Sequence, residues 1–261
     1  MSWRLTPLVI GVALVTAGVL LLLRNLGVLP PGVSLWPLLL VAVGGVLLVG
    51  GLRQGEEAPT EGAETPLEGA REARVALQHG AGVLEVTGTA APGVLLSGTF
   101  AGGVRQSAER QGDRLDVTLR HPSDPDQLFR QHRGLRWSVA LTTEVPIDLE
   151  LSTGAARAHL DLTQVPVRAL RILTGASEVD CSLPSRGRST ARISAGAAEV
   201  RLHVPPGVAA RVRSHTPLAS VTVDQRRFPV WERGYRSAAY ETAEDRVDIE
   251  LEGGVASFHV D

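Results

Sequence analysis

The sequence reads GAARAHL at residues 154–160, GASEVDC at 175–181, GAAEVRL at 196–202 and PLASVTV at 217–223. These blocks begin at intervals of 21 residues, and a short apolar segment precedes each of them. A fixed period of this length with strand–turn–strand content is typical of a solenoid, whose coils bury their apolar faces only against neighbouring coils. Apolar residues alternate with period two from about residue 74 onward. We therefore expect residues 71–261 to form an all-β domain, a single-stranded β-helix with coils of about 21 residues.

Two less regular copies of the block flank the repeats. They read GAGVLEV at residues 80–86 and GVASFHV at residues 254–260. Their irregular spacing predicts terminal coils that close the stack.

The register of the blocks assigns a direction to each side chain. The fifth and seventh positions are apolar in every block, so their side chains are expected to point inward. Cys181 occupies such a position, and we interpret it as a small core residue rather than as a nucleophile. The glycine that opens a block is expected at a corner that needs either positive φ or a close backbone approach.

Outward side chains one coil apart are expected to form charge ladders. Opposite charges on neighbouring strands stabilise a sheet by about 0.2–1 kcal/mol per pair. His159 and Asp180 also allow a catalytic interpretation, but a surface ladder explains them more simply. In sequence order the ladders are Glu150–Arg171–Arg192–Arg213, Arg157–Glu178–Glu199–Ser220 and His159–Asp180–Arg201–Thr222.

Two uncharged segments precede the β region, at residues 5–23 and 33–52. As helices, each would span roughly 28–30 Å, close to the thickness of a bilayer core. The sequence PPG at residues 30–32 predicts a turn between them. We therefore expect residues 1–53 to form a transmembrane hairpin of two α-helices. A cleaved signal peptide and a pair of buried core helices are the alternatives, but no small-x-small cleavage site follows Leu23 and neither segment has a polar face.

Residues 54–70 (QGEEAPTEGAETPLEGA) contain five Glu, two Pro and three Gly. Such a composition predicts a flexible acidic linker between the hairpin and the β domain. A hairpin places the N-terminus and the β domain on one side of the membrane. Arg4 and Arg53 lie on that side and Arg24 lies in the hairpin loop, which slightly favours a cytoplasmic β domain.

Composition and motifs argue against several classes of function. The chain has 26 basic and 28 acidic residues and a net charge of −2, so it lacks the basic excess of a nucleic-acid binder. A single cysteine excludes an intramolecular disulfide and a zinc site built from cysteines. HExxH, GxSxG, Walker and GxGxxG motifs are absent from the sequence, so we expect no enzyme, no cofactor and no resident metal. A metal site formed by His121, Asp124, Asp126 and His132 is the weaker alternative.

Two irregular stretches interrupt the β pattern, at residues 121–136 and 224–240. The second holds both tyrosines of the chain and one of its four tryptophans, together with several arginines. Trp, Tyr and Arg are the residues most enriched in binding hot spots, so we predict an interaction surface here. The alternative is a lid that covers the open end of the solenoid, and the two roles can coexist. The candidate interaction residues are Arg226, Arg227, Phe228, Trp231, Arg233, Tyr235, Arg236 and Tyr240.

Residues 8–52, with LRNLGVL at 23–29 and WPLLL at 36–40, resemble the transmembrane region shared by LiaI- and LiaF-like proteins. The β region resembles the toast-rack and LiaF C-terminal family. The matching pieces are GAGVLEV at 80–86, VPIDLELSTGA at 145–155, LTGAS at 173–177, VPPGV at 204–208 and GYRSAAYETA at 234–243. The resemblance implies a role in cell-envelope stress signalling, where LiaF-like proteins restrain a membrane histidine kinase of a two-component system. It supplies no catalytic residues.

We therefore expect a membrane-anchored, non-enzymatic regulatory or scaffolding protein of bacterial cell-envelope stress signalling that acts by protein contact. It would cross the plasma membrane twice, with the β domain slightly favoured on the cytoplasmic side. The expected partners are the lipid bilayer, a membrane sensor histidine kinase or related envelope proteins, and optionally a second copy of the chain, but not nucleic acid. The alternative is a passive structural or adhesin-like envelope module with an extracytoplasmic β-solenoid.

Overall fold

The computed structural model describes residues 60–122, 135–215 and 219–261. Within these ranges the regular elements are β-strands, joined in one 17-stranded sheet. No helix in these ranges is long and apolar enough to cross a membrane. The predicted transmembrane hairpin, residues 1–53, lies outside the described residues.

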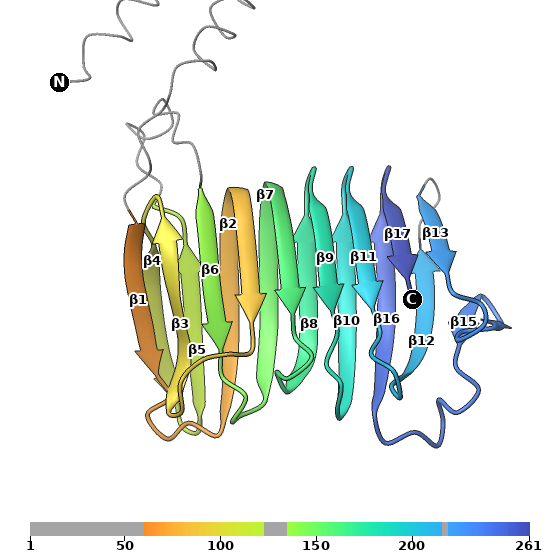
Figure 1. The fold of residues 1–261 in the computed structure, drawn as a ribbon, viewed down its shortest axis with the longest axis horizontal. Coiled ribbons are helices and arrows are strands. Elements are labelled where there is room, and N and C mark those ends of the chain that lie inside the picture. The colour runs from red at the N-terminus through yellow and green to blue at the C-terminus, as the bar shows by residue number, and fades with distance from the viewer. Residues whose placement is uncertain (1–59, 123–134, 216–218) are drawn as a thin grey trace, which may run out of the picture. The chain divides into compact units, whose positions relative to one another are not determined.

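The strands follow one another along the chain and are coloured by residue number in Figure 1. They are β1 (Thr60–Pro66), β2 (Glu72–Thr87), β3 (Val94–Ala101), β4 (Arg105–Gln111), β5 (Arg114–Arg120), β6 (Arg136–Leu141), β7 (Ile147–Asp161), β8 (Val167–Thr174), β9 (Glu178–Ser182), β10 (Arg188–Ala195), β11 (Glu199–His203), β12 (Ala209–His215), β13 (Ser220–Val223), β14 (Val230–Trp231), β15 (Gly234–Arg236), β16 (Arg246–Gly253) and β17 (Ser257–Val260).

The strands stack as parallel neighbours in two rows (Figure 1). The first row runs β5, β2, β7, β8, β10, β16, β12. The second row runs β6, β2, β7, β9, β11, β17, β13. The long strands β2 and β7 contribute to both rows. Each coil supplies one strand, or one part of a long strand, to each row. This stacking agrees with the predicted β-solenoid.

The order of the coils differs from the order of the sequence at the C-terminal end. The last copy of the block is not a terminal coil, because β16 lies between β10 and β12 and β17 lies between β11 and β13. The expected ladder is wrong at this point: Arg192 faces Glu250, and Glu250 in turn faces Arg213. Charge gives a physical reason, since β10 and β12 present arginines and β16 brings Asp248 and Glu250 between them.

The insertion changes the other two ladders as well. Ser257 of β17 lies between Glu199 and Ser220, and His259 lies between Arg201 and Thr222. The earlier rungs of all three ladders are in the predicted register.

The first copy of the block, at residues 80–86, is not a terminal coil either. It belongs to β2, which lies between β7 and the coil formed by β5 and β6. Both irregular copies are therefore placed one coil in from an end. Antiparallel strands then cover the outermost coils, with β4 on β5, β3 on β6, β1 on β3 and β15 on β12.

The structure also corrects the predicted linker over residues 60–70. Residues 60–66 form β1, which pairs antiparallel with β3. Its glutamates are exposed, whereas Thr65 at the end of the strand and the following Leu67 and Ala70 are buried. A Pro at the end of an edge strand costs no ladder hydrogen bond, so this composition is compatible with a strand. Residues 54–59 lie outside the described ranges.

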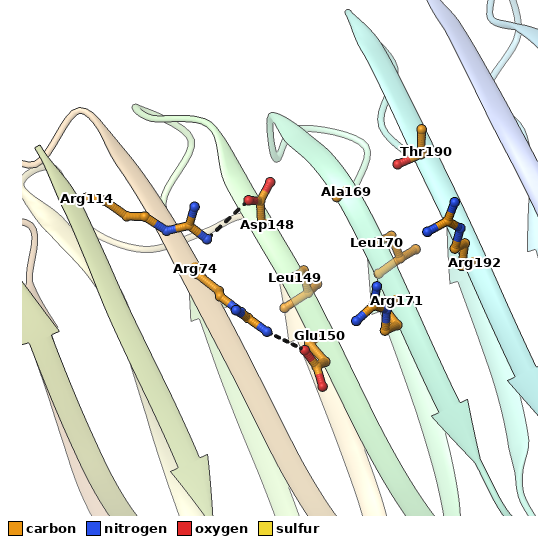
Figure 2. Close-up of a pocket in the computed structure, with 10 residues that line it drawn as sticks. All are labelled: Arg74, Arg114, Asp148, Leu149, Glu150, Ala169, Leu170, Arg171, Thr190 and Arg192. Carbon is orange, nitrogen blue, oxygen red and sulfur yellow. Dashed lines mark hydrogen bonds and ion pairs between the residues drawn. The ribbon is translucent and has the colours of Figure 1, made fainter. Parts of the chain in front are cut away.

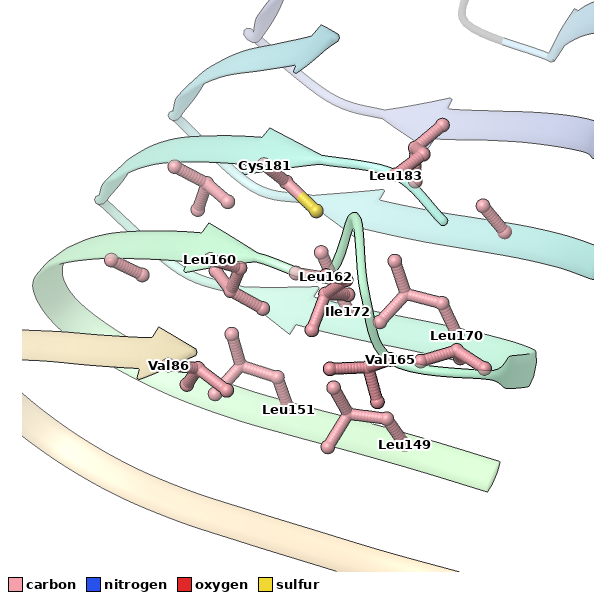
Figure 3. Packing of buried hydrophobic residues seen from close by; sticks show 14 of the residues in the cluster. Val86, Leu149, Leu151, Leu160, Leu162, Val165, Leu170, Ile172, Cys181 and Leu183 are labelled. Atoms are coloured by element: carbon pink, nitrogen blue, oxygen red, sulfur yellow. The ribbon is translucent and has the colours of Figure 1, made fainter. Parts of the chain in front are cut away.

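The core lies between the two rows, as the inward positions predicted. Figure 3 shows Cys181 in one cluster with leucines, valines and Ile172. Cys181 is fully buried, and its burial raises the pKa of the thiol, which confirms it as a core residue. Of the predicted inward residues only Val221 is half-buried, on the outermost coil.

The glycines that open the blocks form a column at one corner of the coils. A Cβ on Gly154 would lie 2.6 Å from the carbonyl oxygen of Gly80, and one on Gly175 would lie 2.7 Å from that of Gly154. Neither glycine has positive φ. The close-approach explanation is therefore correct here, and the positive-φ explanation is not.

Candidate interaction site

Residues 224–240 follow β13 and contain the short strands β14 and β15. The strand β15 pairs antiparallel with β12, the last strand of the first row, and β14 pairs with β15. The segment therefore covers the end of that row, as the lid alternative required.

Two of the candidate aromatic residues lie in the interior. Phe228 is 1% exposed and Tyr240 is 3% exposed. The Tyr240 hydroxyl donates a hydrogen bond to Asp248, and burial together with this bond raises the pKa of Tyr240 to about 12. The prediction that these two rings line an exposed surface is wrong, because they seal the end of the core instead.

Arg227 holds the start of the lid in place. Its guanidinium donates hydrogen bonds to the carbonyl oxygens of Val204 at 2.8 Å and Pro205 at 3.2 Å. The same group lies 4.9 Å from the centre of the Phe228 ring. Carbonyl and ring contacts of this kind leave Arg227 little capacity for a partner.

Arg236 stabilises the tip hairpin of the lid. Its guanidinium stacks 3.9 Å above the ring of Trp231 and forms an ion pair with Glu241 at 2.8 Å. Tyr235 on the same hairpin is half-buried and packs against the core. These three candidate residues therefore stabilise the lid.

The remaining candidates, Arg226 and Arg233, are exposed. The Arg226 side chain is 93% exposed, and its one ion pair with a described residue is to Asp224 at 3.4 Å. Arg233 forms no ion pair with any other described residue, and Val230 on the same hairpin is 68% exposed. Val230 was not among the predicted candidates, although its position within the predicted surface at 224–240 was the available signal. We call these three exposed residues of the lid, Arg226, Val230 and Arg233, the lid tip.

A second polar surface lies on the outer face of the first row, over β2, β7, β8 and β10 (Figure 2). It is a hollow of about 240 Å³. Ala169 lies in register between Asp148 and Thr190, and its small side chain leaves space there. Arg171 and Arg192, which were predicted as members of a charge ladder, line this hollow, but the hollow itself was not predicted. The signal was an alanine at an outward position among charged neighbours.

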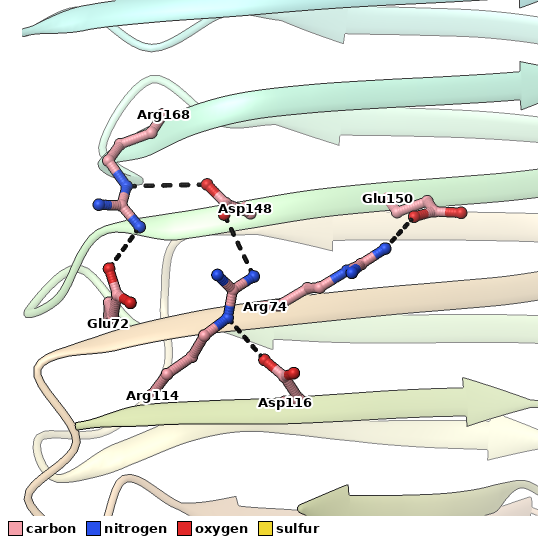
Figure 4. A network of polar contacts seen from close by, with 7 residues as sticks. All are labelled: Glu72, Arg74, Arg114, Asp116, Asp148, Glu150 and Arg168. Carbon is pink, nitrogen blue, oxygen red and sulfur yellow. Dashed lines mark hydrogen bonds and ion pairs between the residues drawn. The ribbon is translucent and has the colours of Figure 1, made fainter. Parts of the chain in front are cut away.

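Ion pairs occupy most of the charged groups around the hollow (Figure 4). Arg114 contacts Asp116 at 2.8 Å and Asp148 at 3.3 Å. Arg74 contacts Glu150 at 2.9 Å. The network also includes Arg168, which contacts Glu72 at 2.7 Å and Asp148 at 3.7 Å.

Arg171 is the exception at this surface. It lies in register between Glu150 and Arg192, but Glu150 pairs with Arg74, and Arg192 pairs with Glu250 at 2.9 Å. Within the described ranges no ion pair involves Arg171. Its guanidinium is therefore free to bind a carboxylate or a phosphate of a partner.

The histidine ladder of the second row does not form a recognisable catalytic site. His159 Nδ1 lies 3.4 Å from Asp180, His203 Nε2 lies 3.5 Å from the same carboxylate, and His203 Nδ1 lies 2.6 Å from Asp261. These groups are partly exposed, and the arrangement is that of a surface ladder. Among the described residues no cluster of three His, Cys, Asp or Glu side chains could hold a metal ion. Residues 124, 126 and 132 of the alternative metal site lie outside the described ranges.

The domain also contains a buried histidine that was not predicted from the sequence. His79 is 1% exposed, and its ring centre lies 5.0 Å from that of Trp137. Both ring nitrogens of His79 lack a hydrogen-bond partner in the described structure, as do Nε2 of His121 and Nε1 of Trp137. Burial, with a smaller contribution from His121, lowers the pKa of His79 to about 4. The available signal was its position directly before Gly80, where the other blocks have the buried residues Thr153 and Thr174.

Comparison with known proteins extends these observations. Residues 53–203 match the family described as the N-terminal domain of toast_rack, and residues 8–48 match the LiaI-LiaF-like transmembrane region. No curated protein matches the sequence.

The chain was also compared with solved structures, and the matches include the following two. A "putative cell adhesion protein" from Clostridium sporogenes is 17% identical, with a TM-score of 0.70 over 78% of this chain and 99% of that one. A "putative adhesin" from Bacteroides fragilis is 6% identical, with a TM-score of 0.28 over 79% of this chain and 98% of that one. The first of these likenesses supports the fold alone.

The toast_rack match extends over more than half of the sequence, and the transmembrane match precedes it. The chain therefore belongs to the LiaF-like toast-rack family of membrane proteins.

Proposed function

We propose that this chain is a membrane-anchored regulatory or scaffolding protein of bacterial cell-envelope stress signalling, and that it acts by protein contact. The observation that supports the proposal most directly is the order of its parts. A LiaI-LiaF-like transmembrane region is followed in one chain by a toast-rack domain. The described surface carries ion-pair ladders rather than a catalytic constellation, which fits a non-enzymatic role.

The lid tip is the proposed contact surface. Arg233 lies in the turn of the β14–β15 hairpin, which the stacking of Arg236 on Trp231 stabilises. Arg226 lies in the turn after β13, where its exposed guanidinium contacts Asp224 at 3.4 Å. An exposed guanidinium can form a bidentate pair with a carboxylate, and exposed Val230 adds apolar contact area. The expected partner surface is therefore acidic with an apolar centre.

The proposed partner is a membrane sensor histidine kinase. A two-pass hairpin with a cytoplasmic β domain would place the lid tip on the same side as the kinase domain of such a sensor. A reporter fused after Asp261 tests this arrangement, with one version active only in the cytoplasm and another only outside it. Activity of the extracytoplasmic version alone would contradict contact with a cytoplasmic kinase domain and would favour the structural or adhesin-like alternative.

The contact itself can be measured with the full-length chain and the sensor kinase in proteoliposomes. We expect the wild-type chain to lower kinase autophosphorylation, and Arg226→Ser combined with Arg233→Ser to relieve that inhibition. The matched control is Arg105→Ser combined with Arg120→Ser, since both of these arginines are also exposed but lie on β4 and β5, at the other end of the stack. Equal effects of the two double variants would contradict the assignment of the lid tip, and a wild-type chain without effect would contradict the regulatory function.

A further inference from the structure

The two rows of the solenoid end in four outer strands, β5 and β6 at one end and β12 and β13 at the other. Three of these strands are covered by antiparallel strands of the same chain, β4 on β5, β3 on β6 and β15 on β12. Over the described ranges β13 pairs with β17 alone. Among the four outer strands, β13 is therefore the one that no further strand covers in the described ranges.

The sequence of this edge strand is unusual for an exposed position. The strand β13 reads SVTV and contains neither a charged residue nor a proline, whereas the outer strands β4 (RQSAERQ) and β1 (TEGAETP) contain both signs of charge or glutamate with proline. Natural sheets protect exposed edges with charges, proline or a covering segment, because a bare edge pairs with other strands. The strand β13 lacks all of these protections in the described structure.

The direction of its backbone groups is also defined. The N–H of Ser220 donates to the carbonyl of Ala256 at 3.0 Å, and that of Asp224 donates to the carbonyl of Val260 at 2.9 Å. Backbone groups alternate in direction along a strand, so Val221 and Val223 direct their N–H and C=O groups away from β17. These outward groups flank Thr222 symmetrically.

We propose that β13 pairs antiparallel with β13 of a second copy of this chain, about a two-fold axis at Thr222. In that register Val221 lies opposite Val223 of the second copy, and each such pair exchanges two backbone hydrogen bonds. Thr222 lies opposite its own equivalent, a favourable cross-strand pair, and no like charges meet. The two copies use the same surface, as a closed two-fold dimer requires.

A strand of four residues gives a small interface, and membrane anchoring compensates for this. The transmembrane region confines all copies to one surface, which raises their effective concentration beyond that of free domains. The dimer is therefore expected in membranes and not in dilute solution.

Disulfide cross-linking of the full chain in membrane vesicles tests the register. The facing Thr222 residues form a pair without hydrogen bonds, with Cα atoms about 4.5 Å apart, which is within disulfide range. Under mild oxidation we expect Thr222→Cys to give at least about fivefold more covalent dimer than Thr190→Cys, an exposed control on β10 in the middle of the stack. Native Cys181 is buried and contributes little background.

A second variant separates edge pairing from folding. Val221→Pro removes an outward N–H that β17 does not use, so the contact between β13 and β17 should survive while the dimer is lost. Val221→Lys serves the same purpose by charge, and the thermal unfolding temperature identifies whichever variant remains folded. The proposal would be overturned if Thr222→Cys cross-linked no better than Thr190→Cys. It would also be overturned if Thr222→Cys cross-linked equally well with and without Val221→Pro or Val221→Lys in the same folded chain. A disulfide to a different protein, identified by mass spectrometry, would overturn it as well.

Discussion

At the scale of single residues, the glycine column sets how closely the coils approach at their corner. Gly175→Ala would place a methyl group about 2.7 Å from a backbone oxygen of the neighbouring coil, so the coils must move apart. We expect a loss of roughly 1–3 kcal/mol in the free energy of unfolding. Gly80→Ala is the matched control, because a Cβ there meets no atom within 4 Å and φ is not positive. Chemical denaturation measures the stability of both variants. Equal stability of Gly175→Ala and Gly80→Ala would contradict the close-approach explanation.

His79 is expected to make the domain sensitive to acid. Its pKa is about 4 in the folded state against 6.5 in the unfolded chain, so the unfolded state takes up a proton first as the pH falls. The free energy of unfolding should therefore be fully retained above pH 6.5 and decrease down to pH 4, by about 3 kcal/mol in total.

Denaturation of His79→Leu at pH 7 and pH 4.5 measures this contribution. The variant removes the titrating group, so its stability should depend less on pH than that of the wild type. His259→Leu, at an exposed position of β17, is the control. A pH dependence that is the same in His79→Leu and in the wild type would show that His79 is not the acid-sensitive group.

At the scale of elements, the charges of β16 favour its place between β10 and β12. Glu250 lies between Arg192 and Arg213, and its ion pair with Arg192 measures 2.9 Å. Glu250→Lys places a cation between Arg192 and Arg213, and we expect a loss of about 1–2 kcal/mol at low salt that shrinks at high salt. Glu252→Lys on the same strand, whose neighbours are Ser194 and His215, should cost less. Thermal unfolding of both variants at two salt concentrations would contradict the charge argument if their losses were alike.

The sequence predicted the local pattern of the elements well and their assembly only in part. The period of 21 residues and the alternation at positions such as Val179 and Cys181 correctly predicted a β-solenoid and its inward face, because these features depend on neighbouring residues alone. Which edge a strand joins depends on distant partners, and all blocks share the same inward pattern, so the placement of β16 and β17 was missed.

The candidate site shows the same division. Arginine and aromatic residues are common both in binding surfaces and in caps over a core, so their presence at 224–240 could not distinguish the two roles. Only the packing shows that Phe228 and Tyr240 are buried while Arg226 and Arg233 are exposed.

At the scale of the whole molecule, the boundary of the β domain decides whether it can be produced alone. The strand β1 covers β3, and Leu67 and Ala70 join the core, so a fragment should begin before Thr60. We expect residues 57–261 to form a soluble all-β domain, and residues 74–261 to be less stable by several kcal/mol, because β3 becomes an open edge and buried apolar contacts are lost. Circular dichroism and thermal unfolding of the two fragments test this. A predominantly helical spectrum would contradict the fold, and equal unfolding temperatures would contradict a structural role for β1.

The insertion of β16 and β17 between earlier coils has a consequence for biosynthesis. A ribosome delivers β10, β11, β12 and β13 before the strands that separate them, so β12 and β13 must wait without their native neighbours until the final residues emerge. The contacts that complete the stack thus join segments far apart in time as well as in sequence, which slows folding. A chain that ended before β16 would leave the arginines of β10 and β12 without their acidic neighbours on β16. It would also leave β12 and β13 without their parallel partners, and we expect quality-control proteases to degrade such a chain.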